Sequence, residues 1–274
     1  MASGDKVSDC FILLVDKSHP GDFNMALDFS MANMVGSGIL PPCVRLYGWS
    51  RTTLSIGRVQ RLSRLNGDFI VENQIPVVRR PTGGRAVLHD DEITYAFALR
   101  RSIDWVKRGT IQTYKVIASI LLSTLKRLGV VGADLERSRS RENLQACYGA
   151  PSLYEISVDR RKLVGSAQYR GEHHVLQHGS IPYTLDLETY SHCFKDPTVE
   201  KLVLEERVIT LSEILHERPS LTNFAEALKK SIKEVLGVHV EVVASLPDEL
   251  SKRAEVLRER FAISLESGRD IASG

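Results

Sequence analysis

The chain has few cysteines and no motif that would pair them. Its four cysteines, Cys10, Cys43, Cys147 and Cys193, lie far apart and form no Cys-x-x-Cys pair. A disulfide scaffold or a structural zinc site is therefore not expected, and unpaired thiols are typical of a reducing compartment. The chain also lacks a long apolar run behind a basic start, which argues against a signal peptide. Its longest apolar stretch, Cys10–Val15, is far too short to span a bilayer.

Neither sign of charge is in clear excess. The 36 Lys and Arg residues and the 34 Asp and Glu residues leave a formal net charge of +2 at pH 7. So small an excess gives no reason to expect nucleic acid or an anionic membrane as a partner. The hydrophobic content of 43% and the charged content of 26% are ordinary for a soluble globular protein. We therefore expect a cytoplasmic protein without a membrane partner.

Internal repeats and low-complexity linkers are also missing from the 274 residues, so the sequence predicts one main domain. Residues 1–9 are small and polar and are predicted to be a disordered N-terminal segment. Residues 10–262 are predicted to form the domain, and residues 263–274 are predicted to be a frayed tail. Strand-like segments and a few helices follow one another without regular alternation. This order predicts an α+β fold with a mixed, largely antiparallel sheet flanked by helices.

The spacing of apolar residues places the individual elements. A helix is predicted after Asp22, its expected N-cap, and two amphipathic helices are predicted at Thr113–Leu128 and Asn223–Leu236, each followed by glycine. Strand-like segments on both sides of Asp159-Arg160 predict a tight hairpin. The remaining predicted strands are Cys10–Asp16, Cys43–Trp49, Thr53–Gly57, Ile75–Arg80, Glu92–Leu99, His174–Tyr183 and His239–Val243.

A glycine pair occurs in RRPTGGRAVLHDDEITYAF, Arg79–Phe97, between two predicted strands. Gly83 and Gly84 permit positive φ and a close approach of the backbone, and exposed N–H groups in such a turn hold carbonyl or carboxyl oxygens. Arg80 and Arg85 add positive charge. The loop is not a Walker A motif, because no Gly-Lys-Ser/Thr follows, nor a dinucleotide fingerprint, because it opens a strand. Taken alone, it fits a tight hairpin with solvated arginines better than an oxygen-binding site.

The whole string resembles the signature loop of the lipoate–protein ligase and lipoyl(octanoyl) transferase family, roughly Arg-Arg-x-Thr/Ser-Gly-Gly-x-Ala-Val-x-His-Asp. Three further blocks resemble strands of that family in the same order, namely TLSIGRVQ (Thr53–Gln60), KLVGSAQ (Lys162–Gln168) and LQHGSI (Leu176–Ile181). The blocks cover residues 53–183, the motif core of the predicted domain. The resemblance implies an α+β catalytic domain of the type shared with biotin protein ligases, with a slot for an acyl chain.

Cys147 lies in ACYGAPSLYE, a turn rich in small residues, and Lys162 lies on the strand after the predicted hairpin. Taken alone, the pair fits a buried small residue and a surface charge better than a catalytic pair. A free cysteine has a pKa near ~8.5, so only about one in thirty is thiolate at pH 7, and a nearby ammonium favours the thiolate. The segment resembles the cysteine-containing transferase branch. That resemblance implies that Cys147 carries the acyl group, while Lys162 lowers its pKa and relays protons.

The resemblance also implies a substrate-binding set. In it the glycine loop and the Gly165-Ser166-Ala167 step orient the acyl carbonyl, and His178 with Gly179 lines the acyl slot. His89 is either a packed strand residue or a wall of the same slot. No metal is expected, because the i, i+4 spacing of His174 and His178 does not bring two ligands together on a strand. The implied set is Arg80, Gly83, Gly84, Arg85, His89, Gly165, Ser166, Ala167, His178 and Gly179.

The implied activity is the transfer of an octanoyl group from octanoyl-acyl carrier protein, through a thioester on Cys147, to the lysine of a lipoyl domain. The implied acceptors are lipoyl-domain proteins such as the glycine cleavage H protein or 2-oxoacid dehydrogenase subunits. No cofactor is implied, because a thioester donor is already activated and requires a nucleophile rather than a nucleotide. The alternatives are an ATP-dependent lipoate–protein ligase, an octanoyl amidotransferase between lipoyl-domain proteins, and a non-catalytic module that binds acyl carriers.

Overall fold

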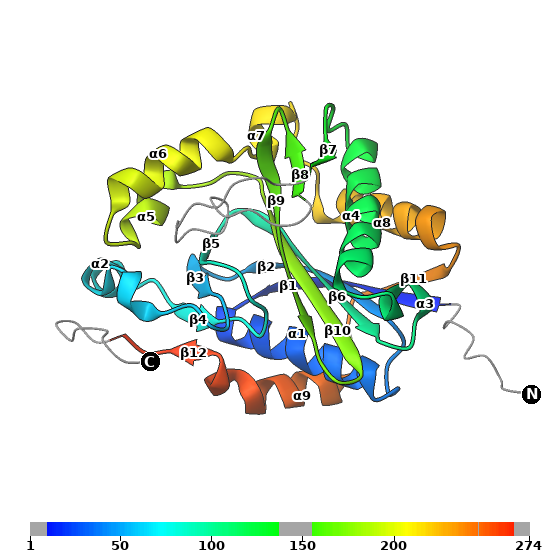
Figure 1. Ribbon diagram of the computed structural model, residues 1–274. Helices are drawn as coiled ribbons and strands as arrows, with labels where there is room; N and C mark the ends of the chain where they lie inside the picture. Colours follow the sequence, from blue (N-terminus) through cyan, green and yellow to red (C-terminus); the bar gives the residue numbers. More distant parts are fainter. Residues whose placement is uncertain (1–9, 137–154, 246, 266–274) are drawn as a thin grey trace, which may run out of the picture.

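The computed structural model describes residues 10–136, 155–245 and 247–265 (Figure 1). These residues form two β-sheets with helices packed around them, which confirms the predicted α+β class. The predicted disordered segment, residues 1–9, lies outside the described residues, as do residues 266–274 of the predicted tail. Within the described ranges, no helix combines the length and the apolar character needed to cross a membrane.

The large sheet is mixed, and most of its neighbouring strands are antiparallel, as predicted. Its described strands lie in the order β11-β1-β2-β6-β10-β9-β8-β7. Among the described strands of this sheet, only the pairings of β1 with β11 and of β1 with β2 are parallel. The strands span β1 (Cys10–His19), β2 (Cys43–Trp49), β6 (Glu92–Arg100), β7 (Asp134–Glu136), β8 (Glu155–Val158), β9 (Arg161–Arg170), β10 (His174–Pro182) and β11 (His239–Val243).

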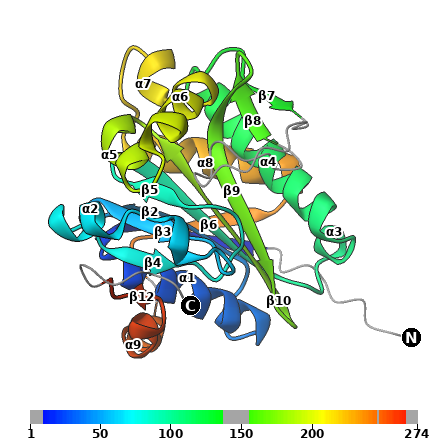
Figure 2. The same cartoon turned by 60° about the vertical axis from the view of Figure 1, so that its left-hand side comes forward.

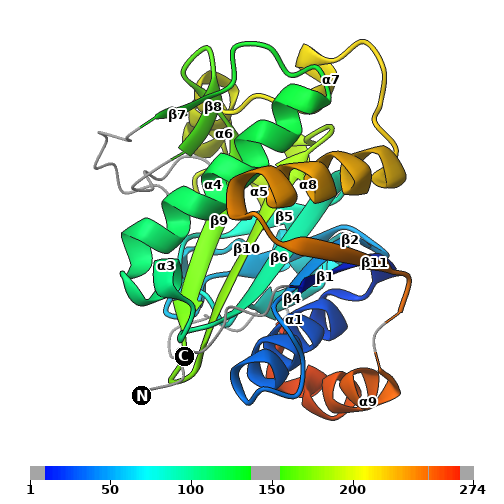
Figure 3. The ribbon, with the colours of Figure 1, turned by 90° about the vertical axis from the view of Figure 1, so that its right-hand side faces the viewer.

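Helices cover both faces of the large sheet (Figures 1 and 3). Helices α4 (Thr110–Arg127) and α8 (Leu221–Leu236) lie side by side on one face. Helices α1 (Gly21–Gly36) and α9 (Asp248–Leu257), with a 3-10 turn at Arg258–Arg260, lie on the other. Each face has its own apolar core, around Phe97 and Phe224 on the first and around Met31 and Leu250 on the second.

The small sheet lies beside the large one and completes the body of the molecule (Figure 2). Its described strands lie in the order β12-β4-β3-β5 and pack with three of the short helices, residues 67–72, 187–192 and 197–207, around a third apolar core. Strand β12 crosses the predicted boundary between residues 262 and 263. The strands are β3 (Thr53–Ile56), β4 (Val77–Arg79), β5 (Val87–His89) and β12 (Ala262–Ile263), and the short helices are α2 (Gly67–Glu72), α3 (Asp104–Lys107), α5 (Leu187–His192), α6 (Pro197–Arg207) and α7 (Leu211–Ile214), with a 3-10 turn at Leu62–Arg64.

The first helix starts earlier than predicted. Asp22 was the expected N-cap, but α1 begins at Gly21 and the capping position is Pro20, with φ −57° and ψ 149°. The fixed φ of proline suits the entry to a helix, and no side-chain hydrogen bond is needed there. Asp22 instead lies in the first turn, where the helix dipole favours a negative charge, and it forms an ion pair with Arg258 at 2.9 Å.

The hairpin between β8 and β9 is as tight as the sequence predicts. Asp159 and Arg160 have φ values of 49° and 61°, the left-handed conformation that both central residues of a two-residue type I′ turn adopt. The turn sets the register, with Val158 opposite Arg161 and Ser157 opposite Lys162, and a bulge follows at this point of β8. The hairpin therefore brings the start of β9 back beside β8.

Candidate active site

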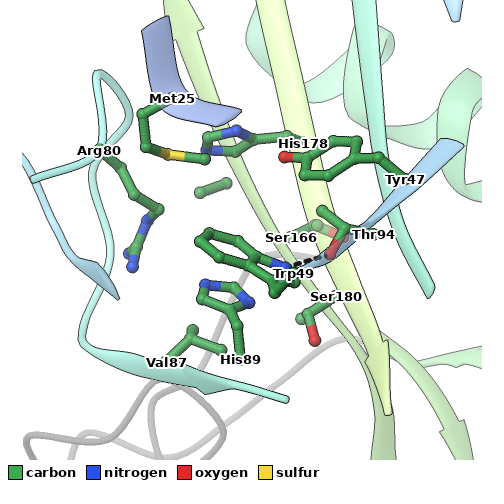
Figure 4. Close-up of a pocket in the computed structure, with 13 residues that line it drawn as sticks. Met25, Tyr47, Trp49, Arg80, Val87, His89, Thr94, Ser166, His178 and Ser180 are labelled. Atoms are coloured by element: carbon green, nitrogen blue, oxygen red, sulfur yellow. Dashed lines mark hydrogen bonds between the residues drawn. The ribbon is translucent and has the colours of Figure 1, made fainter. Parts of the chain in front are cut away.

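A pocket of about 350 Å³ lies between the large and the small sheet (Figure 4). Its walls come from α1, from the loop after β4, and from strands β2, β5, β6, β9 and β10. The predicted residues that line it are Arg80, His89, Gly165, Ser166, Ala167, His178 and Gly179. The structure therefore brings these predicted residues, from distant parts of the chain, around one space.

One side of the pocket is an aromatic pair over a buried carboxylate. The rings of Trp49 and His89 are stacked, with centroids 3.9 Å apart and planes inclined by 11° (Figure 4). His89 Nδ1 lies 2.9 Å from Glu92 Oε1, and its Nε2 lies 2.6 Å from Ser55 Oγ. Burial opposes the charge on Glu92, but His89 and the hydroxyls of Thr94 and Ser180 outweigh it and lower its pKa. His89 is thus both a packed strand residue and a wall of the pocket.

His178 is buried and is held at both ring nitrogens. Its Nδ1 lies 3.0 Å from Asp28 Oδ2, and its Nε2 lies 2.7 Å from Thr82 Oγ1. Burial lowers the pKa of His178 in spite of the opposing effect of Asp28, so the ring is neutral. In that state Nδ1–H donates to Asp28 and the hydroxyl of Thr82 donates to Nε2. Arg45 donates from Nη1 to the other oxygen of Asp28 at 2.8 Å and balances its charge inside the core.

The glycine loop is tied together by Arg80. The buried guanidinium donates to Ser55 O and Oγ at 2.8 and 2.7 Å, and to the carbonyls of Gly83 and Arg85 at 3.0 and 2.7 Å. Gly84 has the expected positive φ, +90°. Arg80 lines the pocket, whereas Gly83, Gly84 and Arg85 are not among the described residues that do. The loop therefore offers carbonyl oxygens to Arg80, which fixes the edge of the pocket.

Lys162 lies at the start of β9 and is almost fully buried, with 4% of its side chain exposed. Its Nζ donates to Glu155 Oε1 at 3.0 Å, across the β8–β9 hairpin. A carboxylate at this distance stabilises the ammonium form of a lysine that burial would otherwise disfavour. Further along the same strand, Gly165 begins the wall of the pocket. The predicted catalytic lysine is therefore a buried cation on the strand that borders the pocket, and not a solvated surface charge.

The predicted nucleophile, Cys147, lies outside the described residues. Two of the three cysteines that are described are chemically unsuited to its role, because burial raises the pKa of Cys43 and of Cys193 to about 12. Cys10 lies on β1, and its Sγ is 3.6 Å from the carbonyl of Phe11. None of these three lines the pocket.

Sequence reasoning missed six further residues that line the pocket, namely Met25, Tyr47, Trp49, Val87, Thr94 and Ser180. It also missed Asp28 and Arg45, the buried ion pair that supports His178. A signal for the support was present: Asp28 interrupts the apolar face of a helix, and Arg45 interrupts an apolar strand. A single charge within an apolar run points to a buried partner, because a lone buried charge is costly. The pattern does not, however, say that these two charges meet each other.

The stability of the fold is expected to fall as the pH drops below neutral. Burial holds the pKa of His178 and of His174 below the ordinary 6.5, so the unfolded chain binds these protons first. Their contribution is complete above pH 6.5 and is lost as the pH falls from that value toward their lower pKa in the folded chain. Glu92, whose pKa is lowered, adds a second loss below 4.5. Denaturant midpoints measured between about pH 8 and pH 4 test this.

The matched control for this pH profile is His216, which is exposed and lies outside the pocket. His216→Gln should leave the dependence of the midpoint on pH unchanged. His178→Gln should flatten it between about pH 7 and pH 5, in addition to any loss of stability at all pH values. A wild-type midpoint that does not move in this range would contradict the assignment of a neutral, buried His178.

Solved structures of known proteins share this fold. The crystal structure of lipoate-protein ligase A bound with ATP aligns with a TM-score of 0.72 at 20% identity, covering 91% of this chain and 94% of that chain. The bi-partite lipoate protein ligase from Thermoplasma acidophilum gives a TM-score of 0.70 at 20% identity and covers 91% of each chain. The described elements therefore form the catalytic fold of lipoate–protein ligases, as the sequence predicted.

Sequence comparison is more specific. Residues 20–233 match the lipoyl protein ligase A/B catalytic domain. Octanoyltransferase LipM of Exiguobacterium sp. is 36% identical over 242 residues, which are 84% of this chain and 87% of that protein. Octanoyltransferase LipM of Staphylococcus aureus is 33% identical over 252 residues, 87% of this chain and 91% of that protein. The chain belongs to the lipoyl protein ligase A/B catalytic domain family, which confirms the resemblance found in its motifs.

Proposed function

We propose that the chain is an octanoyltransferase that moves an octanoyl group from the thioester of an acyl carrier protein to the lysine of a lipoyl domain. Cys147 is the nucleophile that carries the group between the two partners. The acceptors are lipoyl-domain proteins such as the glycine cleavage H protein or 2-oxoacid dehydrogenase subunits. The relatives that are 33% and 36% identical carry the name octanoyltransferase over most of their length, which supports this activity class.

The observation that carries the proposal is the combination found on strand β9. Lys162, the second residue of the strand, is a buried cation held by Glu155, and Gly165, Ser166 and Ala167 form one wall of the pocket further along. A cation in a poorly hydrated place stabilises a nearby thiolate more strongly than it would in water. The adjoining pocket gives an acyl chain a place to lie while its carbonyl is held near that cation.

The proposed reaction balances without a nucleotide. The thiolate of Cys147 attacks the thioester carbonyl, a new carbon–sulfur bond forms, and the carrier leaves as a thiol after it takes a proton from Lys162. The acceptor lysine then attacks the enzyme thioester, its amine gives a proton back through Lys162, and the thiolate of Cys147 leaves. The first step exchanges one thioester for another and is close to neutral in free energy, and the amide product makes the second step favourable.

The decisive test is intact mass after incubation with octanoyl-acyl carrier protein in the absence of nucleotide. The wild-type chain should gain one octanoyl group that hydroxylamine removes, because a thioester reacts with hydroxylamine and an amide does not. Cys147→Ser should gain none and should not transfer. Cys10→Ser is the matched control, because Cys10 is a described cysteine away from the pocket, and it should load like the wild type.

Two results would overturn the proposal. A Cys147→Ser chain that transfers octanoyl at the full rate would exclude the covalent step. Lipoylation from free lipoate or octanoate that requires ATP and magnesium, with no loading from the carrier thioester, would assign the chain to the ligases instead. Octanoyl taken only from an octanoylated lipoyl domain would keep Cys147 as the nucleophile and replace the donor.

A further inference from the structure

A second cavity, of about 540 Å³, shares Arg80 with the acyl pocket. It lies where α1, the loop after β3, β4, the end of β9 and the turn after α9 come together, so it is built from both ends of the chain. Its further lining residues are Arg58, Arg79, Arg260, Phe29, Pro81, Tyr169 and Phe261. Nothing in the proposed transfer uses these seven side chains.

The second cavity concentrates positive charge without a carboxylate. None of its lining residues is acidic, and among the described residues no Asp or Glu forms an ion pair with Arg58, Arg79 or Arg260. Nearby Arg258 shows the contrast, because it pairs with Asp22 and with Glu255, each at 2.9 Å. Although the net charge of the protein is only +2, the described residues gather the guanidinium groups of Arg58, Arg79 and Arg260 at one cavity with no described carboxylate paired to them.

These guanidinium groups are held in place. Arg79 Nη1 donates to the carbonyls of Gly57, Arg58 and Gln60 at 3.2, 3.2 and 2.9 Å, which leaves its other nitrogens outside these bonds. The guanidinium of Arg58 lies 5.4 Å from the ring centre of Tyr169. Contacts of this kind restrict a side chain before a ligand arrives and so reduce the entropy lost on binding.

Arg260 completes the arrangement from the opposite end of the chain. Its guanidinium lies 5.2 Å from the ring centre of Phe29, and Phe29 in turn packs on Phe261 with ring centroids 5.8 Å apart. The cavity therefore has aromatic walls that carry arginine side chains on their faces. Burial also lowers the pKa of Arg79, which shows that water does not fully solvate its charge there.

We propose that this second cavity is a binding site for a phosphoryl group, held by Arg58, Arg79 and Arg260. A planar guanidinium donates two parallel N–H groups and matches phosphate oxygens, which makes arginine well suited to phosphate recognition. A carboxylate has only two oxygens and would engage fewer of the three side chains. The aromatic walls suit the carbon part of a phosphate ester. The proposal does not depend on the octanoyl transfer proposed above, because it concerns different side chains.

Two kinds of ligand carry a phosphoryl group that this site would bind. One is a free phosphate compound. The other is the phosphodiester of the phosphopantetheine arm on an acyl carrier, which would place the thioester end of the arm toward the acyl pocket because both spaces share Arg80. Binding of inorganic phosphate tests whether the site exists. Binding of the carrier protein, with and without its arm, tests which of the two ligands the site serves.

The test is calorimetric titration of the full chain with inorganic phosphate. Arg58 and Arg260 are exposed, so Arg58→Gln/Arg260→Gln should fold normally and bind phosphate at least about tenfold more weakly, the loss expected for one to two charge-assisted contacts. Arg253→Gln is the matched control, an exposed arginine of the neighbouring helix paired with Glu249 outside the cavity, and it should bind phosphate like the wild type. Equal affinity in the double variant, or no saturable binding to the wild type, would overturn the proposal.

A second titration compares carrier protein with and without its phosphopantetheine arm, both lacking an acyl group. Tighter binding of the armed carrier to the wild type, lost in Arg58→Gln/Arg260→Gln, would support the site and assign it to the arm. Equal binding of both carriers, with arginine-dependent binding of inorganic phosphate, would support the site and assign it to a free phosphate compound. Neither titration requires turnover, so failure of the octanoyl transfer and failure of the phosphoryl site give different results.

Discussion

Replacing Lys162 by methionine is expected to slow octanoyl transfer by about 10²–10⁴-fold, the range typical of a lost proton-transfer group. The lysine is 4% exposed and lies 3.0 Å from Glu155, so its charge acts in a place that water screens poorly. Methionine keeps the apolar stem but carries no charge. Without the cation, the thiol of Cys147 is expected to return toward an ordinary pKa near ~8.5. Intact mass followed against time gives the loading rate.

The dependence of the rate on pH separates this role from a structural one. If Lys162 keeps Cys147 ionised, the wild-type loading rate should change little between about pH 7 and pH 9, whereas Lys162→Met should speed up with pH until the thiol ionises near ~8.5. A lysine that only supports the fold would lower the rate without changing the shape of this profile. A Lys162→Met chain that loads as fast as the wild type would exclude the proposed role altogether.

A double variant removes the complication of the lost counter-charge. Lys162→Met takes one cationic partner from the carboxylate of Glu155, which is 13% exposed, and loss of a counter-charge beside a largely buried carboxylate destabilises the fold. Lys162→Met/Glu155→Gln should recover most of the lost melting temperature but none of the transfer rate. The neighbouring pair Arg161 and Glu213 is the matched control. Because it is partly exposed, its removal should cost less than about 1 kcal/mol and leave the loading rate near that of the wild type.

Local patterns in the sequence predicted most of the elements, because each depends on neighbours in the chain. The apolar spacing of Thr113–Leu128 is enough to define α4, and the residues on both sides of Asp159-Arg160 are enough to define a tight turn. The strands β5 and β12 were not predicted, because each is only a few residues long and exists through its partners in the small sheet. Tertiary pairing, rather than propensity, decides such segments.

The candidate site, like the fold, was predicted only in part from the sequence. The motif resemblance placed His89, Gly165 and His178 at one pocket, and the structure brings them together. It could not show that His178 binds Asp28, because that contact joins strand β10 to helix α1 across most of the chain. The resemblance also could not show which of the predicted glycines the fold requires. A glycine in a sequence does not reveal whether the folded chain leaves room for a Cβ at that position.

Gly179 and Gly83 show how large that difference is. Gly179 lies in β10 opposite Ser166 of β9, and a Cβ added to it would meet the carbonyl oxygen of Gly165 at 2.2 Å and the hydroxyl of Tyr95 at 2.6 Å. The first atom belongs to the backbone of the neighbouring strand and cannot move without opening the sheet at the pocket wall. A Cβ on Gly83 would meet nothing within 4 Å.

Gly179→Ala is therefore expected to lower the free energy of unfolding by about 3 kcal/mol, the upper end of typical overpacking costs. For a chain of this size that loss corresponds to about 6–12 °C in melting temperature. If this pocket holds the acyl chain as proposed, loading of Cys147 should fall in parallel, because β9 and β10, which the added Cβ would separate, form one wall of the pocket. Gly83→Ala, the matched control, should change stability by less than about 0.5 kcal/mol. Equal melting temperatures for the two variants would mean that β9 and β10 are not packed as closely as described, and the pocket between the sheets would lose its main support.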